Sequence, residues 1–334
     1  MERILEVNDL HVTFTTYGGT VQAVRGVDFH LDRGETLAIV GESGCGKSVT
    51  SNAIMRLIPS PPGKITKGSI VFKGEDVTTY SEKKMRAIRG VDISMIFQDP
   101  MTALNPTLTI GTQLMEGLKE HKKITRAQAK EKAIEMMDLV GIPNPEERLK
   151  QYPHQFSGGM RQRIVIAIAL ICDPDLLIAD EPTTALDVTI QAQILELFST
   201  IQERTGVSII LITHDLGVVA KIADRIIVMY AGKIIESGTK REIFYQPKHP
   251  YTRGLLNSVP RLDTKEELKP IVGTPPDLFS PPKGCPFTAR CPYAMEVCDK
   301  VYPAQATISD THHVDCWLQD ERAKWLLAAK SLQT

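Results

Sequence analysis

The segment that restricts the fold most is "GESGCGKS", residues 41–48, which follows the wholly apolar "LAIV" and precedes "VTSNAIMRLI". It fits the pattern G-x-x-x-x-G-K-[ST], in which backbone N–H groups and the N-terminus of the next helix surround phosphate oxygens. A buried strand, a glycine-rich loop and a helix in this order predict a nucleotide phosphate site. A glycine-rich turn without a ligand is the weaker alternative.

Each residue type in this loop has a physical role beside a phosphate. Glycine permits the tight curl and the close approach of the backbone. Lys47 supplies a positive charge for the β- and γ-phosphates, and Ser48 offers its hydroxyl to Mg²⁺. The nucleotide contacts predicted for the loop are Gly41, Ser43, Gly44, Cys45, Gly46, Lys47, Ser48 and Val49.

A pair of carboxylates supplies the second half of such a site. In "LLIADEP", Asp180 ends an apolar strand, where a carboxylate can bind the Mg²⁺ of a nucleotide. Glu181 comes next and is placed to orient or deprotonate an attacking water. A solvated acidic turn is the alternative, and the phosphate loop elsewhere in the chain makes it the weaker one.

Apolar runs alternate with helical patterns along the first 240 residues. Residues 1–40 contain two alternating segments typical of antiparallel strands, and further runs at 93–97, 176–180 and 208–213 have the composition of buried strands. Residues 226–238 predict two strands with a turn at Ala231–Gly232. The alternation predicts an α/β fold with a parallel sheet and helices on both faces.

Two helices are predicted with defined ends. One covers "TRAQAKEKAIEMMDLVG", with Ala129, Ala133, Met137 and Val140 on one face and Gly141 at its end. The other covers "IVIAIALI", whose β-branched residues also suit a strand. A helix is favoured because Ser157 upstream can cap it and Asp173–Pro174 would stop it.

Composition excludes several classes of protein. The formal net charge of −1 over 334 residues offers no basic footprint for nucleic acid. The longest apolar run, residues 164–172, is half the length of a membrane span, and the N-terminal residues do not resemble a signal peptide. We therefore expect a cytoplasmic protein that works at a membrane only through partners.

Between the phosphate loop and the carboxylates stands "FSGGMRQR", residues 156–163, which resembles the signature motif of ATP-binding cassette (ABC) ATPases. Met160 occupies a position where glutamine is commoner. Other cassette motifs are in register over residues 1–240. They are Phe14 or its neighbour Tyr17 at the aromatic position that stacks on adenine, Gln98 at the Q-loop, "TALD" (184–187) at the D-loop and His214 at the switch histidine.

This resemblance implies a P-loop α/β fold with a RecA-like core, an antiparallel β subdomain and an α-helical subdomain at about residues 99–163. The nucleotide-binding domain is expected over residues 1–240. An irregular, proline-rich extension is expected over residues 241–334, ending in a short helix at "DERAKWLLAAK".

The resemblance also implies a mechanism in which two cassettes dimerise head to tail around ATP. Ser157, Gly158 and Gly159 would contact the ATP of the partner subunit. We expect the attacking water to be surrounded by Glu181, His214 and Gln98. We expect Mg²⁺ to be bound by Ser48, Gln98 and Asp180. Asp187 of the D-loop is expected to contact nucleotide.

The segments 98–111 and 249–260 resemble the ATPase subunits of dipeptide, oligopeptide and nickel importers. That group implies a second homologous ATPase chain, two transmembrane permease subunits and an extracytoplasmic substrate-binding protein. The chain would then lie on the cytoplasmic face of the cell membrane as a peripheral subunit. Peptide import is the main interpretation; import of nickel or another small solute, or a soluble cytosolic ATPase, are the alternatives.

The extension also gathers four cysteines, which are Cys285, Cys291, Cys298 and Cys316. Their spacing, C-x5-C-x6-C-x17-C, lacks the paired C-x2-C of most zinc sites, and favours a 4Fe–4S cluster with a structural role. Members of the peptide-importer group carry a similar cysteine cluster, which agrees. Zinc and unmetallated thiols are the alternatives, with His312 and His313 as substitute ligands.

Overall fold

The computed structural model describes residues 2–98, 103–183, 187–258 and 270–323. The chain divides into two compact units, each described here by itself. The first takes the described residues within 1–6, 30–36 and 71–213, and the second those within 7–29, 37–70 and 214–334. Strands β1 (Arg3–Thr16), β2 (Gly19–Asp32), β3 (Thr36–Val40) and β4 (Gly63–Phe72) have residues in both units.

The first unit contains parallel strands in the order β8-β7-β6. These are the apolar runs predicted as buried strands, and every residue of β7 and β8 is buried. Continuous aliphatic strands without alternation are typical of a sheet covered on both faces. The elements of this unit are β5 (Glu75–Asp76), α2 (Glu82–Ile88), β6 (Ile93–Ile96), α4 (Ile110–His121), α5 (Arg126–Leu139), α6 (Pro145–Arg148), α7 (Gly158–Leu170), β7 (Leu176–Asp180), α8 (Val188–Thr205) and β8 (Ser208–Thr213).

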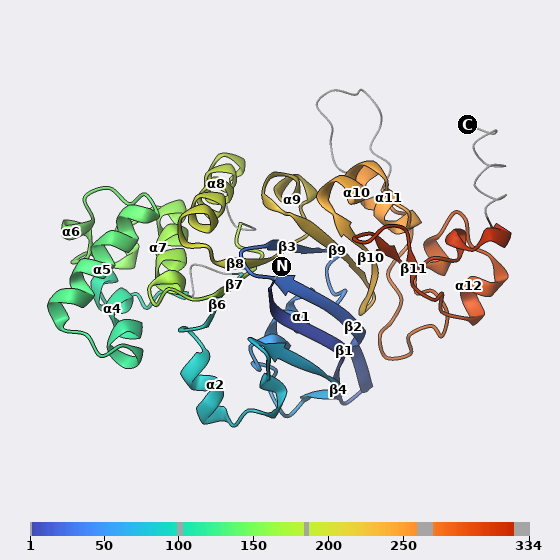
Figure 1. Ribbon diagram of the computed structural model, residues 1–334, viewed down its shortest axis with the longest axis horizontal. Coiled ribbons are helices and arrows are strands. Elements are labelled where there is room, and N and C mark those ends of the chain that lie inside the picture. The colour runs from blue at the N-terminus through green and yellow to red at the C-terminus, as the bar shows by residue number, and fades with distance from the viewer. Residues whose placement is uncertain (1, 99–102, 184–186, 259–269, 324–334) are drawn as a thin grey trace. The chain divides into compact units, whose positions relative to one another are not determined.

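Helices α4, α5 and α7 pack against one another (Figure 1). Thr125 begins α5 with a capping box, because its hydroxyl accepts from the N–H of Gln128 while the Gln128 side chain accepts from the N–H of Thr125. The predicted apolar face of α5 is confirmed, since its four residues are fully buried, and Gly141 follows the helix with a φ of +73°. α7 is also a helix as predicted, and it is buried around most of its circumference.

The second unit contains strands in the order β11-β12-β10-β9-β3. β3 is parallel to β9, and β9 is antiparallel to β10 across the predicted turn at Ala231 and Gly232, which both have positive φ angles. Strands β2, β1 and β4 are neighbours in a separate sheet. The other elements of this unit are β3 (Thr36–Val40), α1 (Lys47–Ile54), α9 (Leu216–Ile222), β9 (Arg225–Tyr230), β10 (Lys233–Thr239), α10 (Lys240–Tyr245), α11 (Pro250–Asn257), α12 (Glu296–Lys300), β11 (Ala306–Thr307) and β12 (His313–Val314).

The C-terminal extension contains more regular structure than its sequence predicts. β12 pairs antiparallel with β10, with Val314 opposite Glu236, so that the extension adds strands to the sheet. Two-residue strands and five-residue helices are too short to show a hydrophobic period. Of the helix predicted at 320–330, the described part is a 3-10 turn at Glu321–Ala323, and the rest lies outside the described residues.

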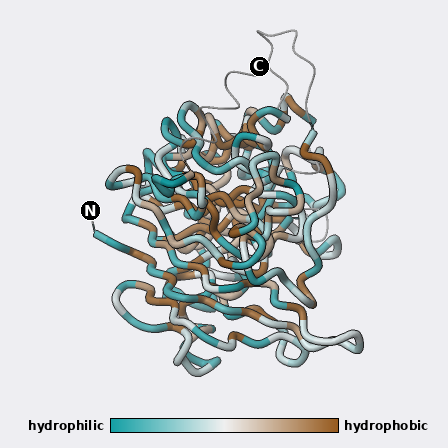
Figure 2. Tube along the Cα trace, turned by 90° about the vertical axis from the view of Figure 1, so that its right-hand side faces the viewer, coloured by the Kyte–Doolittle hydropathy of each residue, from teal (hydrophilic) through white to brown (hydrophobic). Residues whose placement is uncertain are grey.

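Apolar segments gather toward the interior of the trace and polar segments toward its outside (Figure 2). In the second unit the core includes an aromatic group formed by Tyr230, Tyr251 and Phe287, all buried. Their ring centroids are 4.6 Å apart for the two tyrosines and 5.3 Å from each tyrosine to Phe287. Rings at these distances join β9 to two parts of the extension, α11 and the segment around Phe287, in one packed group. None of the helices in the described part of the chain combines the length and apolar character that crossing a membrane requires.

Candidate functional site

The predicted phosphate loop lies between the buried strand β3 and helix α1 in the second unit. The Lys47 side chain is buried, and its ammonium donates to the carbonyl oxygens of Gly41 at 2.8 Å and Glu42 at 3.1 Å. The loop therefore curls around its own lysine. Backbone N–H groups at the start of α1 and one buried ammonium make a surface suited to phosphate.

Two glycines are required by close backbone contacts. A Cβ at Gly41 would lie 2.3 Å from the carbonyl oxygen of Met229, and one at Gly46 would lie 2.6 Å from that of Ala23. Gly46 also has a φ of +105°, which an L-residue rarely adopts. Between these two glycines, Ser43 and Gly44 are exposed and Cys45 is buried. After them, Ser48 and Val49 are half-buried at the start of α1.

The first unit brings Gln98 and Glu181 together. Gln98 follows β6 and Glu181 follows β7, and the Gln98 amide donates to the Glu181 carboxylate at 3.2 Å. Asp180 ends β7 and is buried. Glu181 has a φ of +48°, and its N–H donates to the carbonyl of Ile212 at 2.9 Å. A non-glycine residue held in this region is unusual, and such residues cluster at functional sites.

The predicted signature residues lie on an exposed turn at the start of α7. The Ser157 hydroxyl accepts from the N–H of Met160 at 3.4 Å and caps the helix, as predicted. Ser157 and Gly158 are exposed, whereas a Cβ at Gly159 would meet the Ile190 side chain at 2.7 Å. The turn thus presents a hydroxyl and helix N–H groups outward, which suits an anion brought by another molecule.

The remaining predicted residues occupy accessible positions. His214 directly follows β8 and is exposed, and Asp187 caps α8 by accepting from the N–H of Ile190 at 2.9 Å. D-loop residues 184–186 lie outside the described residues. Phe14 is half-buried, with its ring against Gly63, while Tyr17 is fully exposed.

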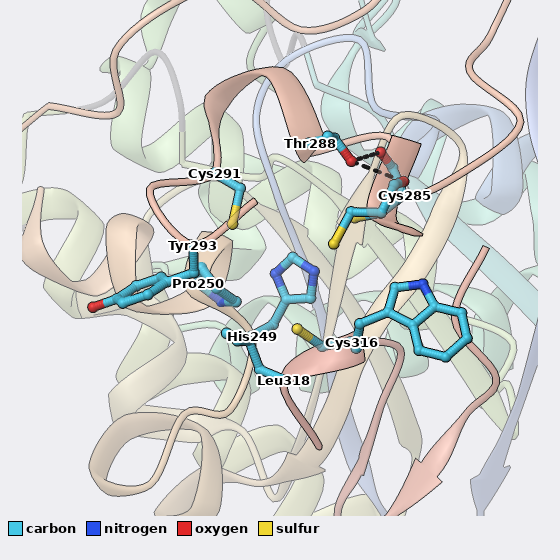
Figure 3. Close-up of a pocket in the computed structure, with 10 residues that line it drawn as sticks. His249, Pro250, Cys285, Thr288, Cys291, Tyr293, Cys316 and Leu318 are labelled. Atoms are coloured by element: carbon cyan, nitrogen blue, oxygen red, sulfur yellow. Dashed lines mark hydrogen bonds between the residues drawn. The ribbon is translucent and has the colours of Figure 1, made fainter. Parts of the chain in front are cut away.

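All four cysteines of the extension line one cavity, together with His249 and Trp317 (Figure 3). The cavity also borders Thr288, whose hydroxyl donates to the carbonyls of Cys285 at 2.7 Å and Cys298 at 3.0 Å. Burial raises the pKa of the Cys285 thiol to about 11 and that of Cys316 to about 12. Without a cation these two groups are neutral thiols at pH 7.

His249 presents an N–H to this cavity. Its Nδ1 accepts from the N–H of Tyr251 at 3.0 Å, which places the ring proton on Nε2. Nε2 is buried and has no hydrogen-bond partner among the described residues. Burial lowers the pKa of His249 to about 4, so the ring is neutral at pH 7. Figure 3 shows the ring among the cysteine thiols.

The predicted 4Fe–4S cluster of the four cysteines, and zinc as its alternative, find no support among the described residues. Within residues 2–98, 103–183, 187–258 and 270–323, no three His, Cys, Asp or Glu side chains converge as a metal ion requires. The two histidines named as substitute ligands lie elsewhere. His312 Nε2 is 2.8 Å from a carboxylate oxygen of Glu236, and His313 lies in β12, opposite Ser237 of β10.

Comparison with known proteins decides the family. Residues 24–184 match the family described as ABC transporter, and residues 235–298 match the family described as oligopeptide/dipeptide transporter, C-terminal region. The chain is 70% identical over 325 residues to the dipeptide transport ATP-binding protein DppD of Bacillus subtilis (strain 168), and the match covers 97% of each chain. The chain belongs to the peptide-transport family of ABC ATPases.

Other relatives of this ABC ATPase agree. It is 62% identical over 318 residues to the oligopeptide transport ATP-binding protein OppD of the same organism, covering 95% of this chain and 89% of the relative. The dimeric, ADP- and Pi-bound structure of the ATP-binding cassette MJ0796 superposes with a TM-score of 0.63 at 26% identity, covering 71% of this chain and 99% of that one. The predicted fold class is confirmed.

Sequence reasoning missed residues of the ABC ATPase's extension that touch the phosphate loop. Arg290 forms an ion pair with Glu42, and the Tyr251 hydroxyl accepts from the N–H of Glu42 at 2.9 Å. No local pattern marks these contacts, because Arg290 lies 248 residues from Glu42. From the sequence alone, a single arginine in a proline-rich segment is interpreted as a solvent-exposed charge.

Proposed function

We propose that this ABC ATPase hydrolyses ATP to energise the import of dipeptides or oligopeptides through a membrane transporter. The main support for the proposal is the sequence identity to two peptide transport ATP-binding proteins, which extends over nearly the whole chain and includes the extension. A nickel or other small-solute importer and a soluble cytosolic ATPase are less well supported, because the relatives' names concern peptides.

We assign the nucleotide to the loop at residues 41–48. Its N–H groups and Lys47 would bind the phosphates, and Phe14, with Tyr17 as the alternative, would stack on adenine. Mg²⁺, which an ABC ATPase requires, would be held by Ser48, Gln98 and Asp180. These are oxygen donors, the type that Mg²⁺ prefers.

Water activation is assigned to Glu181, with Gln98 and His214 as its neighbours in the reaction. The contact between Gln98 and Glu181 supports this assignment, because it orients the carboxylate that would take the proton. His214 would donate to the γ-phosphate. Catalysis then consists mainly of positioning and of charge stabilisation.

A second cassette would complete the site. The exposed turn at Ser157, Gly158 and Gly159 would bind the ATP held by the partner's phosphate loop, and Asp187 would contact nucleotide at the same interface. The dimeric form of MJ0796 supports a cassette dimer. We propose a heterodimer with a homologous ATPase chain.

The rest of the assembly follows from the family. Two permease subunits would span the membrane, a substrate-binding protein would deliver peptide on the other side, and this chain would lie peripherally at the cytoplasmic face. Within the chain we propose a nucleotide-binding domain over residues 1–240, with a helical subdomain at about 99–163, followed by an extension over residues 241–334.

Reconstitution of the assembled transporter tests the proposal. ATP hydrolysis and uptake would be measured with the binding protein and a peptide series from two to about ten residues, and with Ni²⁺ in parallel. Peptide-stimulated hydrolysis is the expected result. Stimulation by Ni²⁺ without any response to peptide, or hydrolysis that needs no membrane subunit, would refute it.

We further propose that Cys285, Cys291, Cys298 and Cys316 bind a 4Fe–4S cluster. Two observations support the fit: four thiols line one cavity, and the unpartnered N–H of His249 points into it, as a donor to sulfur would. A cluster binds each thiolate at a different iron, so its ligands need not converge on one point, whereas zinc requires convergence. When bound, the cluster would cross-link the parts of the extension that carry the four cysteines. It would take no part in ATP hydrolysis.

Metal analysis of anaerobically purified protein tests the cluster. We expect iron and acid-labile sulfide with visible absorbance, all lost in Cys298→Ser but kept in the control Cys172→Ser, whose thiol lies outside the cavity. Zinc without iron, or no metal at all, would contradict it.

A further inference from the structure

The C-terminal extension contacts the phosphate loop within the second unit. Arg290 Nη1 lies 2.6 Å from one carboxylate oxygen of Glu42, the second residue of the loop, and Nη2 lies 3.0 Å from the other. The Arg290 side chain is only 5% exposed. The Glu42 side chain is 27% exposed. A bidentate pair with a buried arginine is stronger and more directional than an ion pair between two exposed side chains.

The other donors of Arg290 are also engaged. Its Nε donates to the Val272 carbonyl at 3.1 Å, Nη2 to the Ile271 carbonyl at 3.1 Å, and Nη1 to the Tyr230 hydroxyl at 3.2 Å. A guanidinium has five N–H donors, and here all five have acceptors. The position of this charge relative to the loop is therefore determined by the extension and by β9.

Glu42 is held at its backbone as well as at its side chain. Its N–H donates to the buried hydroxyl of Tyr251 at 2.9 Å, and its carbonyl accepts from Lys47 at 3.1 Å. Tyr251 is in turn oriented by its own N–H, which donates to His249 Nδ1 at 3.0 Å. Two residues of the extension thus hold one residue of the phosphate loop at its carboxylate and its N–H.

We propose that Arg290 and Tyr251 are positioning residues for nucleotide binding, so that the extension sets the affinity of the phosphate loop for MgATP. This rests on the proposed function of residues 41–48. Arg290 holds the Glu42 carboxylate in an orientation that faces the guanidinium, and the positive charge of the guanidinium neutralises it. Without Arg290, an uncompensated negative charge would stand in the loop that receives the phosphates, and like charges repel.

The test is Arg290→Gln in the full-length chain, with MgATP affinity measured by calorimetry and kcat and KM measured in the assembled transporter. We expect MgATP binding to weaken about 10-fold, because the uncompensated Glu42 carboxylate repels the phosphates, and KM to rise while kcat at saturating MgATP is retained. Arg322→Gln is the matched control, because this arginine of the extension pairs with Asp320 and is 85% exposed.

A second substitution separates positioning from folding. Glu42→Gln removes the charge that Arg290 neutralises, so the double variant Glu42→Gln/Arg290→Gln should recover most of the lost affinity. Tyr251→Phe removes one acceptor but no charge, so its smaller loss should persist when Glu42→Gln is added.

The outcomes are distinguishable. If the wild-type chain does not bind MgATP, the proposed function fails. If the wild type binds and Arg290→Gln binds equally well, or if the variant only lowers the melting temperature, the positioning role is wrong. Additive losses in the double variant would refute the role of charge neutralisation.

Discussion

The side-chain amide of Gln98 donates to the carboxylate of Glu181 at 3.2 Å. The two residues follow β6 and β7, which are parallel neighbours, so both side chains emerge at the same edge of the sheet. The chain between them includes helices α4, α5 and α7. Two residues separated by 83 positions are thereby brought into contact, at the point where we propose that water is activated.

Replacement of Glu181 by Gln should separate binding from hydrolysis. The substitution preserves the shape of the side chain but removes its capacity to accept a proton. We expect MgATP affinity to be retained and turnover in the assembled transporter to fall about 100- to 10,000-fold. Steady-state hydrolysis measures this, with Glu203→Gln on the exposed side of α8 as the control. Full turnover in Glu181→Gln would show that another group is the base.

Replacement of Ser157 by Glu should act on the neighbouring subunit's nucleotide. A carboxylate at the start of α7 would repel the phosphates that this turn is assigned to receive. We expect MgATP binding to the isolated chain to be unchanged and hydrolysis by the assembled transporter to be lost. Ser81→Glu is the matched control, because Ser81 caps α2 in the same way. Equal hydrolysis in both variants would contradict the head-to-tail arrangement.

The buried carboxylate of Glu236 should be essential to the stability of the extension. It accepts from the N–H of Lys248 at 2.6 Å, from that of His249 at 2.9 Å and from the His312 ring at 2.8 Å. Glu236→Leu would leave these donors buried without acceptors, and we expect a loss of about 3–5 kcal/mol in the free energy of unfolding, measured by urea titration. Glu236→Gln, which keeps acceptor oxygen, should cost less. Equal losses in the two variants would show that the hydrogen bonds are not the cause.

The stabilisation by Glu242 should depend on pH. Burial raises the pKa of its carboxyl, but hydrogen bonds from neighbouring groups outweigh burial and lower the pKa from 4.5 to about 2. The donors include Thr239, Ser309 and Thr311. Because the folded-state pKa is depressed, the stabilisation is complete above pH 4.5 and is lost as the pH falls toward 2.

Melting curves of Glu242→Gln against wild type would measure this. We expect a deficit of about 1 kcal/mol at pH 6, after allowing for solvent screening, that disappears near pH 2. Glu296→Gln is the control, because that carboxylate pairs with Lys300 on the same short helix. A deficit that stays constant across this range would mean that ionisation of Glu242 is not involved.

The first 240 residues could be predicted well because their signals are local. In the phosphate loop, the buried strands and the ends of α5, the sequence signal lies within the same few residues that make up the element. The composition of "IVIAIALI" suits both a helix and a strand, and Ser157 upstream favours the helix that forms, because a cap is a hydrogen bond between positions three residues apart.

The extension could not be predicted to the same depth. β12 has two residues, and it forms because β10 offers an edge to pair with, not because His313 and Val314 prefer a strand. The spacing of the cysteines predicts that they form a group, and all four line one cavity. Its position near Cys316 makes His312 a candidate ligand in the sequence, yet the side chain is buried against Glu236, a partner 76 positions away that no spacing rule identifies.

Periodicity, caps and glycine-rich loops are short-range features, so the order of residues alone specifies the class of fold and the glycine-rich loop after β3, and it is the basis on which the groups that act on ATP are proposed. Contacts between distant segments are different, because many pairings of a given arginine or carboxylate are compatible with the same local patterns. The tertiary structure selects one of them. Burial selects the ion pair of Arg290 with Glu42 and leaves the N–H of His249 without a partner inside the thiol-lined cavity. The exposed contact of Gln98 with Glu181 forms because β6 and β7 pair in parallel and end at the same edge of the sheet.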